Sequence, residues 1–329
     1  MKLITIILPV YNGEKYLKQS IESCLNQSHS YFELIIIDDF SADNSREIIR
    51  EFKGSDSRIR FYKNKKNIGL PETLNKGHEL AKGNYITWTS DDNTYHKNAL
   101  EILLKNIAIE NSEFVYSHCN VIDESGSEIG FLSAKNPENL FFENCVGACF
   151  LYTRKFIETV GTYNADRTYV EDYDYWLRGL QHFKLKPVKE ILYSYRFHNS
   201  NLTADISRDI VKKKQFSKNL KDSLKGLVGM SDGLLDYFIK AHFKEQGFSW
   251  ELVKNRDLIL EGNLLEEKSG LRPNVLTSIM VIKLVNLIFQ TREFQNLQTL
   301  GFIYTLKYFW KAKIPIKRRA ALIKKCAWG

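Results

Sequence analysis

Two adjacent acidic residues, Asp91 and Asp92, follow a short apolar run at residues 85–88 and are the residues of this chain best suited to chemistry. Neighbouring carboxylates repel each other unless a cation lies between or beside them. Mg2+ and Mn2+ prefer one or two carboxylates together with phosphate oxygens and water. The pair therefore indicates a metal-bridged phosphate ester such as a nucleotide, although Asp-Asp-Asn is also a common turn sequence.

Two more polar clusters follow apolar runs that predict strands. The loop at Pro9 carries Tyr11, which could stack on a base, and Asp39 could accept a hydrogen bond from a base N–H or a ribose hydroxyl. In open parallel sheets, ligands bind at the carboxyl ends of the strands. Each cluster alone is compatible with an ordinary loop, but three at one sheet edge favour a ligand site.

The elements that must position these residues alternate between strand and helix. Apolar runs predict strands at residues 3–8, 33–37, 59–62, 85–88 and 114–118. Amphipathic segments predict helices at residues 14–26, 41–52, 70–81 and 96–111. Ser41 is the expected cap of the second helix. This alternation predicts a mainly parallel α/β sheet with helices on both faces.

The pattern changes in the second half of the chain. A hairpin is expected at residues 121–130, strands at 146–152 and 191–196, and a helix at 174–181. Beyond His198 only helical segments are predicted, at residues 207–224, 234–245, 250–260, 275–289 and 294–310. We therefore expect an α/β domain at residues 1–205 and a helical region at 206–329.

Glycine-rich phosphate loops are absent from the sequence. The first strand is followed by V-Y-N-G-E-K rather than G-x-G-x-x-G, and G-x-x-x-x-G-K-[ST] does not occur. Metal-mediated binding of phosphates through the carboxylates is therefore favoured.

Four ordered segments resemble the family 2 glycosyltransferases. They read T-I-I-L-P-V-Y-N-G-E-K-Y-L, F-E-L-I-I-I-D-D-F-S-A-D-N-S, N-I-G-L-P-E-T-L-N-K-G and G-N-Y-I-T-W-T-S-D-D-N. The resemblance covers roughly the first 200 residues. It implies the GT-A fold, a Rossmann-like mixed sheet with helices on both faces, followed here by a helical C-terminal region.

The resemblance also implies roles on the donor side. Asp39, helped by Tyr11 and the loop at Pro9, would recognise uracil or another pyrimidine. Asp91 would lie near the ribose, and Asp92 would bind Mn2+ or Mg2+ on the diphosphate of a nucleotide sugar.

Further positions follow from the same resemblance. Many members have an aspartate two places before Asp91, where this chain has Thr89, which leaves fewer carboxylates for the metal. Y-S-Y-R-F-H-N-S resembles a Y-R-x-H segment, which implies His198 as a metal or diphosphate ligand and Arg196 as a phosphate partner. Gly147 matches a loop near the donor sugar, where a missing side chain lets the ligand approach.

A catalytic base is needed because a sugar hydroxyl is a weak nucleophile until its proton is removed. T-Y-V-E-D-Y-D-Y-W-L-R resembles the family's E-D motif, which implies Asp172 as the base and Glu171 as its neighbour. The alternative is a helix N-terminus whose acids complement the dipole, and Asp174 fits that alternative better. The Q-x-x-R-W motif of processive synthases is absent, so we expect one sugar per encounter.

The net charge of +8 comes entirely from the C-terminal tail. Beyond Glu293 there are eight basic residues and no acidic one, whereas the preceding residues are formally neutral. Basic residues interleaved with aromatic ones suit an anionic membrane surface. The alternative is a packed terminal helix with a solvated basic face. No base-reading module accompanies the tail, so no nucleic-acid partner is expected.

Five cysteines form no C-x-x-C pair, and their odd number argues against a disulfide framework. Buried free thiols fit a reducing cytosol. The N-terminal apolar run is interrupted at Pro9, and no stretch of 18 apolar residues occurs. We expect a cytoplasmic protein that binds peripherally to the inner face of the cell membrane.

The resemblance predicts an inverting transferase that moves a sugar, from UDP in the first instance, to a hydroxyl of a glycan acceptor. A polyprenyl-diphosphate-linked glycan of capsule or lipopolysaccharide assembly would suit a surface-bound enzyme. Two alternatives stay open: a catalytically silent nucleotide-sugar-binding scaffold, and transfer to a polyprenyl monophosphate. The base, sugar, acceptor and linkage are not fixed by the sequence.

Overall fold

The computed structural model describes residues 2–199, 201–227, 230–243 and 279–280. The chain divides into two compact units, one of residues 1–140 and 144–220 and one of residues 141–143 and 221–329. Every predicted site residue lies in the first unit. The predicted division into an α/β domain at residues 1–205 and a helical region at residues 206–329 stays a prediction.

A nine-stranded sheet forms the centre of the first unit, with the order β3-β2-β1-β4-β8-β6-β9-β5 and with β7 paired to β6. Its strands are β1 (Ile4–Val10), β2 (Phe32–Asp38), β3 (Ile59–Lys63), β4 (Tyr85–Trp88), β5 (Thr94–Tyr95), β6 (Phe114–Ile122), β7 (Glu128–Leu132), β8 (Phe150–Thr153) and β9 (Leu185–Arg196). Strands β1 to β4 are parallel, and β9 is parallel to β6. Strand β8 runs antiparallel to both β4 and β6. The expected mixed, mainly parallel sheet is therefore confirmed.

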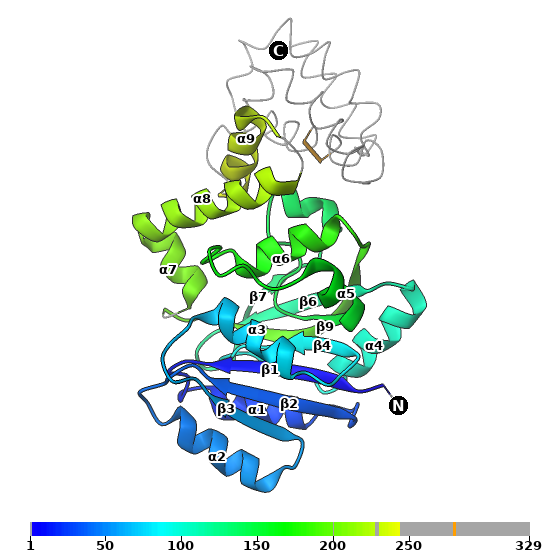
Figure 1. The fold of residues 1–329 in the computed structure, drawn as a ribbon, viewed down its shortest axis with the longest axis vertical. Coiled ribbons are helices and arrows are strands. Elements are labelled where there is room, and N and C mark those ends of the chain that lie inside the picture. Colours follow the sequence, from blue (N-terminus) through cyan, green and yellow to red (C-terminus); the bar gives the residue numbers. More distant parts are fainter. Residues whose placement is uncertain (1, 200, 228–229, 244–278, 281–329) are drawn as a thin grey trace, which may run out of the picture. The chain divides into compact units, whose positions relative to one another are not determined.

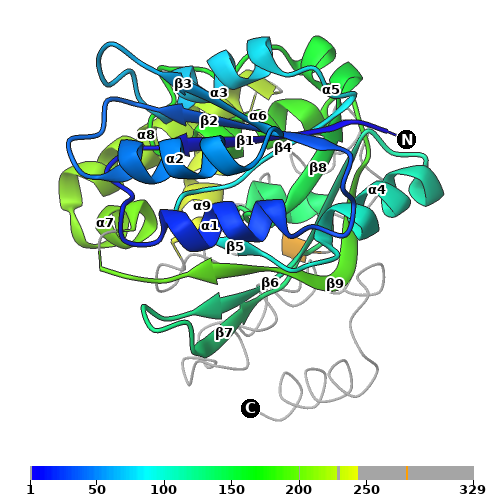
Figure 2. The ribbon, with the colours of Figure 1, turned by 90° about the horizontal axis from the view of Figure 1, so that it is seen from below.

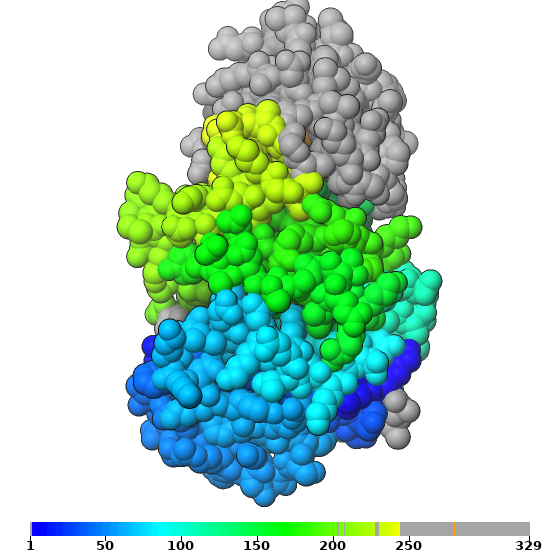
Figure 3. Space-filling model, viewed as in Figure 1, coloured from blue at the N-terminus to red at the C-terminus, as the bar shows by residue number. Residues whose placement is uncertain are grey.

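Helices cover both faces of this sheet (Figures 1 and 2). The helices wholly within the first unit are α1 (Leu17–Leu25), α2 (Ser45–Ser55), α3 (Leu70–Leu80), α4 (Ala99–Glu110), α5 (Arg154–Val160), α6 (Glu171–Leu180) and α7 (Leu202–Arg208), while the short 3-10 helix at Pro137–Phe141 and α8 (Ile210–Leu227) begin in it. Helices α1 and α2 lie on one face and α3 on the other (Figure 2). In space filling, the blue and cyan atoms of the N-terminal segments meet the green atoms of α5 and α6 along one continuous surface (Figure 3).

The core explains why the first strands are continuously apolar. Side chains alternate across β1, so that Ile6 packs with Leu17 and Ile21 of α1 while Ile7 faces α3. A Cβ added at Gly77 of α3 would lie 2.5 Å from Ile7 Cγ2, so the glycine permits close packing. A strand covered on both faces buries every side chain, which produces a run rather than an alternation.

Two sequence predictions about helices are corrected by the structure. Ser41 does not cap a helix: its Oγ accepts a hydrogen bond from Asn12 N–H at 3.0 Å, and α2 begins at Ser45. The single helix expected at residues 207–224 is two helices, because Asp209 is extended and its Oδ1 accepts from Val211 N–H at 2.7 Å. The sequence pattern also missed α5 and β5.

In the second unit, helix α9 (Asp232–His242) begins at Ser231, whose Oγ accepts from Leu234 N–H at 3.2 Å. Phe142 packs on Phe238 with ring centroids 5.2 Å apart. The helices expected at 250–260 and 294–310, most of the helix expected at 275–289, and the basic tail lie outside the described residues.

Four cysteines, Cys24, Cys119, Cys145 and Cys149, are free and buried as expected, and Cys326 lies outside the described residues. Within the part of the chain that the structure describes, no helix combines the length and apolar character needed to cross a bilayer.

Candidate functional site

The carboxyl ends of β1, β2, β4, β6 and β9 lie at one edge of the sheet, because β8 is antiparallel to both β4 and β6. The loop that enters β8, which contains Gly147, therefore reaches the same edge. Asn144 in this loop donates to Asp172 Oδ2 at 2.9 Å, so the N-terminus of α6 is tied to it. The topology thus gathers the predicted site residues along one edge.

The loops after β1 and β2 are joined by hydrogen bonds. Asn12 N–H donates to Ser41 Oγ, and Ala42 N–H donates back to Asn12 Oδ1 at 2.8 Å. Gly13 N–H donates to Ser45 Oγ at 3.0 Å. Residues 11–14 and 39–45 therefore form one cross-linked surface, here named the β1–β2 platform.

Asp39 on this platform is buried and organises the loop at residues 64–69. Its Oδ1 accepts from Asn64 Nδ2 at 2.8 Å and from Ile68 N–H at 2.9 Å, and its Oδ2 accepts from Gly69 N–H at 2.8 Å. A carboxylate has about four acceptor positions, so Oδ2 keeps room for one more donor. The predicted role of Asp39 in base recognition is compatible with these contacts and stays a prediction.

Asp91 lies directly against the β1–β2 platform. Its Oδ2 accepts from Tyr11 N–H at 3.4 Å, and a Cβ added at Gly13 would lie 2.2 Å from the same oxygen. Burial, and then the charges of Asp92 and Asp43, raise the pKa of Asp91 to about 7. A cation at this position would favour the ionised form of Asp91.

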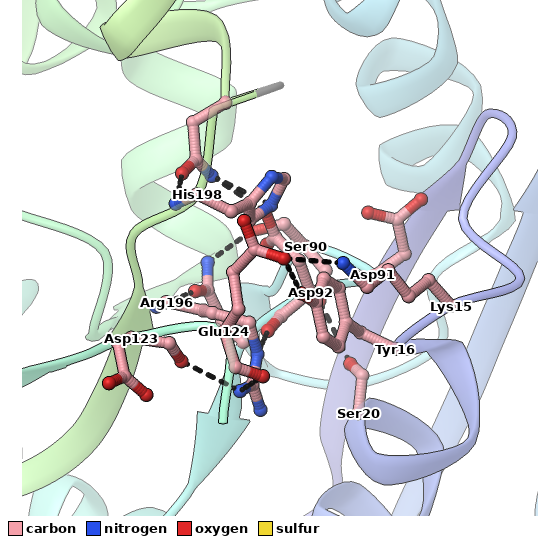
Figure 4. Close-up of polar contacts among 12 residues, drawn as sticks. Lys15, Tyr16, Ser20, Ser90, Asp91, Asp92, Asp123, Glu124, Arg196 and His198 are labelled. Atoms are coloured by element: carbon pink, nitrogen blue, oxygen red, sulfur yellow. Dashed lines mark hydrogen bonds and ion pairs between the residues drawn. The ribbon is translucent and has the colours of Figure 1, made fainter. Parts of the chain in front are cut away.

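Asp92 is held through one of its two carboxylate oxygens (Figure 4). Oδ2 accepts from Asn201 Nδ2 at 2.9 Å and lies 3.0 Å from His198 Nε2. Oδ1 is buried and has no hydrogen-bond partner among the described residues. The structure thus brings together the two residues predicted to bind metal.

The donor set fits Mg2+ or Mn2+. Asp92 Oδ1 is a buried carboxylate oxygen without a hydrogen-bond partner among the described residues, and a nearby cation would lower the raised pKa of the second carboxylate, Asp91. No group of three or more His, Cys, Asp or Glu side chains capable of holding a metal occurs within the described residues. Diphosphate oxygens and water would complete the coordination, as is usual for these ions. Thr89 adds no carboxylate to this set, and its buried hydroxyl lies 2.6 Å from the Tyr193 hydroxyl.

Arg196 is buried and committed to protein oxygens. Its Nε donates to Asp92 O at 3.0 Å, and one terminal nitrogen donates to the carbonyls of Asp123 and Glu124 at 3.1 and 3.4 Å. The other terminal nitrogen donates to Gln19 Oε1 at 2.7 Å. These contacts make Arg196 a clamp that positions the backbone of Asp92, and its predicted contact with a phosphate stays a prediction.

Tyr16 packs between these groups at the start of α1 (Figure 4). The Arg196 guanidinium lies 4.4 Å from the centroid of its ring, and the His198 ring lies 5.4 Å away. Beside it, Lys15 Nζ and Glu124 Oε2 form an exposed ion pair at 2.6 Å. Aromatic packing on Tyr16 therefore links the Arg196 clamp to His198, the predicted metal ligand.

Asp172 and Glu171 open helix α6. Asp172 Oδ1 accepts from Tyr173 N–H at 2.6 Å, and Oδ2 accepts from Asn144. Burial raises the pKa of both carboxyl groups, and the charge of Asp172 raises that of Glu171 further. A raised pKa brings a carboxylate closer to the value that suits a general base at neutral pH.

Two other predicted positions have structural explanations. Asp174 pairs with Arg178 at 2.8 Å, which supports the structural role expected for it. Gly147 has φ +69°, while the nearest atom to an added Cβ is Cys119 Sγ at 4.0 Å. The glycine is therefore required by its backbone conformation, and its predicted contact with the donor sugar stays a prediction.

Four side-chain amides that orient charged groups of the site are not among the predicted site residues. Asn201 holds Asp92, Asn144 holds Asp172, Asn64 holds Asp39 and Gln19 holds Arg196. Asn201 follows His198 by three residues, and this short spacing is the single signal that could have identified it. Asparagine is a common loop residue and glutamine a common helix residue, so Asn144, Asn64 and Gln19 of α1 carried no signal.

The family model described as Glycosyl transferase family 2 matches residues 5–161. The chain is 30% identical over 213 residues to the uncharacterized glycosyltransferase MJ1057 of Methanocaldococcus jannaschii, covering 60% of this chain and 71% of that protein. It is 27% identical over 209 residues to the putative teichuronic acid biosynthesis glycosyltransferase TuaG of Bacillus subtilis, covering 62% and 82%. It is also 29% identical over 217 residues to an uncharacterized glycosyltransferase of Rickettsia felis, covering 62% of this chain and only 36% of that relative's length.

Solved structures share the fold. S. aureus TarS 1-349 in complex with UDP-GlcNAc has a TM-score of 0.60 at 14% identity, covering 94% of this chain and 89% of that one. The mannosyltransferase PcManGT from Pyrobaculum calidifontis in complex with GDP-Man and Mn2+ has a TM-score of 0.56 at 14% identity, covering 94% and 87%. The expected GT-A fold is confirmed.

Proposed function

Because this chain belongs to glycosyltransferase family 2, we propose that it transfers a sugar from a nucleotide-diphosphate donor, with UDP as the first candidate, to a hydroxyl of a glycan acceptor. The observation that carries this proposal is the state of Asp92, whose Oδ2 is held while its buried Oδ1 has no hydrogen-bond partner among the described residues. The complexes of TarS with UDP-GlcNAc and of PcManGT with GDP-Man and Mn2+ support a nucleotide sugar and a metal.

One group of residues acts on the nucleotide-sugar donor and another acts on the acceptor. Asp39 and Asp91 orient the nucleoside, and Asp92 and His198 provide the protein ligands for a divalent cation. Such a cation, when bound, acts as a Lewis acid that stabilises charge on the departing diphosphate.

Asp172 removes the proton from the acceptor hydroxyl. The hydroxyl then attacks the anomeric carbon from the face opposite the diphosphate, which inverts the configuration in one displacement. Asn144 and the Tyr173 N–H hold the two oxygens of Asp172, so that the carboxylate keeps one orientation.

The acceptor side of the proposal is a cell-surface glycan linked to polyprenyl diphosphate. The similarity to TuaG supports polysaccharide synthesis. The basic residues between Lys307 and Lys325, which lie outside the described residues, would hold the chain at an anionic membrane. Co-sedimentation with anionic vesicles should occur at low salt and weaken at high salt, and equal sedimentation with neutral vesicles would contradict this part of the proposal.

Calorimetry with UDP and GDP, each with and without Mn2+, tests the donor side. We expect metal-dependent binding of at least one nucleotide, and slow hydrolysis of the matching nucleotide sugar to release that nucleotide. Binding without hydrolysis or transfer to any acceptor would favour the silent scaffold. Transfer to a polyprenyl monophosphate rather than to a glycan hydroxyl would identify the other alternative.

A further inference from the structure

Backbone strain in the first unit is concentrated beside the predicted site residues. The described non-glycine residues with positive φ are Asn12 (55°), Phe40 (69°), Asn111 (45°) and Tyr169 (74°). Asparagine tolerates this conformation, whereas a bulky aromatic residue is strained in it. Phe40 directly follows Asp39, and Tyr169 precedes Glu171 by two positions.

The backbone on both sides of Phe40 is fixed by hydrogen bonds. Asp39 N–H donates to Val10 O at 2.8 Å, and Ser41 N–H donates to Asp38 Oδ1 at 3.1 Å. The carboxylate of Asp39 and the hydroxyl of Ser41 are also bonded, to the loop at residues 64–69 and to Asn12 respectively. Phe40 must therefore adopt the left-handed conformation that its neighbours impose.

The ring of Phe40 does not compensate for this strain by packing in the core. It is 48% exposed, and glycine or asparagine would satisfy the same backbone with less strain. Tyr11, which follows the neighbouring strand, is 53% exposed. Because Val10 and Asp38 are register partners, the ends of β1 and β2 are neighbours, and each is followed within two residues by an exposed aromatic residue, Tyr11 and Phe40.

We propose that the Phe40 ring is a contact surface for the nucleoside of the donor and contributes to its affinity. This inference rests on the proposed function, because it requires a nucleotide at the β1–β2 platform. Phe40 directly follows Asp39, whose Oδ2 keeps an acceptor position, and its exposed ring belongs to the same platform on which we place the base. Stacking or edge contact between a base and an aromatic ring changes affinity by roughly 5- to 150-fold.

The test compares four forms of the full chain: wild type, Phe40→Asn, Phe40→Tyr and Asn111→Gly. Nucleotide affinity is measured by calorimetry with UDP and with GDP in the presence of Mn2+, and stability is measured by thermal unfolding. Phe40→Asn should weaken binding about tenfold, which corresponds to ~1.4 kcal/mol, and should not lower the unfolding temperature. Phe40→Tyr keeps a ring and should bind within about twofold of wild type.

Asn111→Gly is the matched control, because it relaxes a left-handed residue at the C-terminus of α4 without touching the platform. It should leave nucleotide affinity unchanged. Inorganic pyrophosphate, which lacks a base, should bind to wild type and to Phe40→Asn with the same affinity in the presence of Mn2+.

The outcomes separate this inference from the proposed function. If wild type binds neither nucleotide, the proposed function fails and the inference fails with it. If wild type binds and Phe40→Asn binds equally well, the inference alone is overturned. It is also overturned if Phe40→Asn unfolds at a clearly lower temperature, or if its affinity for pyrophosphate falls as much as its affinity for the nucleotide. In either case the ring would support the platform rather than contact the base.

Discussion

At the scale of single residues, substitution of Asp172 should abolish sugar transfer without affecting nucleotide binding. The change Asp172→Asn keeps the size of the side chain and removes its ability to accept a proton. We expect the turnover number to fall by about 10²–10⁴, the usual contribution of a general base, while the Kd for nucleotide and Mn2+ stays within about twofold. Asp166→Asn, which alters an exposed acid in the loop before α6, is the control and should keep full activity. Normal turnover by Asp172→Asn would show that the base is another residue.

The pH profile gives a second prediction for the same carboxylate. Burial raises the pKa of Asp172, and the hydrogen bond from Asn144 lowers it by stabilising the ionised form. Only the ionised form accepts a proton, so kcat/KM should rise with pH and level off above the pKa. In Asn144→Ala the stabilising bond is lost, so the rise should move to higher pH. A rise at unchanged or lower pH would contradict the assignment.

The site residues that can be predicted from the sequence are those whose type and position directly after a strand indicate ligand binding. Asp92 has such a position, whereas His198 is implied by the family resemblance, and the structure places the two side chains 3.0 Å apart. Arg196 shows the limit of this reasoning: residue type indicates a cation, but only the fold shows carbonyls from two loops occupying its guanidinium. Asn144 acts through a contact with Asp172, 28 residues away in the sequence, that no spacing rule specifies.

At the scale of elements, apolar runs predicted the parallel strands well because strands buried on both faces read as continuous apolar segments. Helix boundaries were less predictable, since they depend on which side-chain acceptor meets the free N–H groups. Ser41 has the right chemistry for a cap, yet its hydroxyl bonds to Asn12 across the platform. The break between α7 and α8 depends on the backbone of Asp209, which a helical pattern does not reveal.

Two glycine-to-alanine changes test how the loop after β1 positions Asp91. In Gly13→Ala the new Cβ would lie 2.2 Å from Asp91 Oδ2, so Asp91 must move, and nucleotide affinity should fall by at least about tenfold, a loss of ~1.4 kcal/mol. In Gly54→Ala nothing lies within 4 Å of the new Cβ, and the change falls in the last turn of α2. It should raise the free energy of unfolding by about 0.5–1 kcal/mol and leave binding unchanged. Equal nucleotide affinity in the two variants would mean that the close approach of Gly13 to Asp91 is not needed for nucleotide binding.

At the scale of the whole molecule, strand order decides which loops meet. The sequence predicts a mainly parallel sheet, but not that β8 is inserted antiparallel between β4 and β6. This insertion turns the loop before β8 towards the edge formed by the parallel strand ends, and it carries Asn144 to Asp172. Long-range pairing of this kind depends on the packing of the complete sheet, so short sequence patterns cannot specify it.

The most direct test of the account is an anomalous difference map of crystals soaked with a nucleotide sugar and Mn2+. The account predicts a manganese peak within bonding distance of Asp92 Oδ1, with the diphosphate on the same ion and the base beside Asp39. A nucleotide bound elsewhere, or a nucleotide at this edge with no manganese at Asp92, would contradict the central claim.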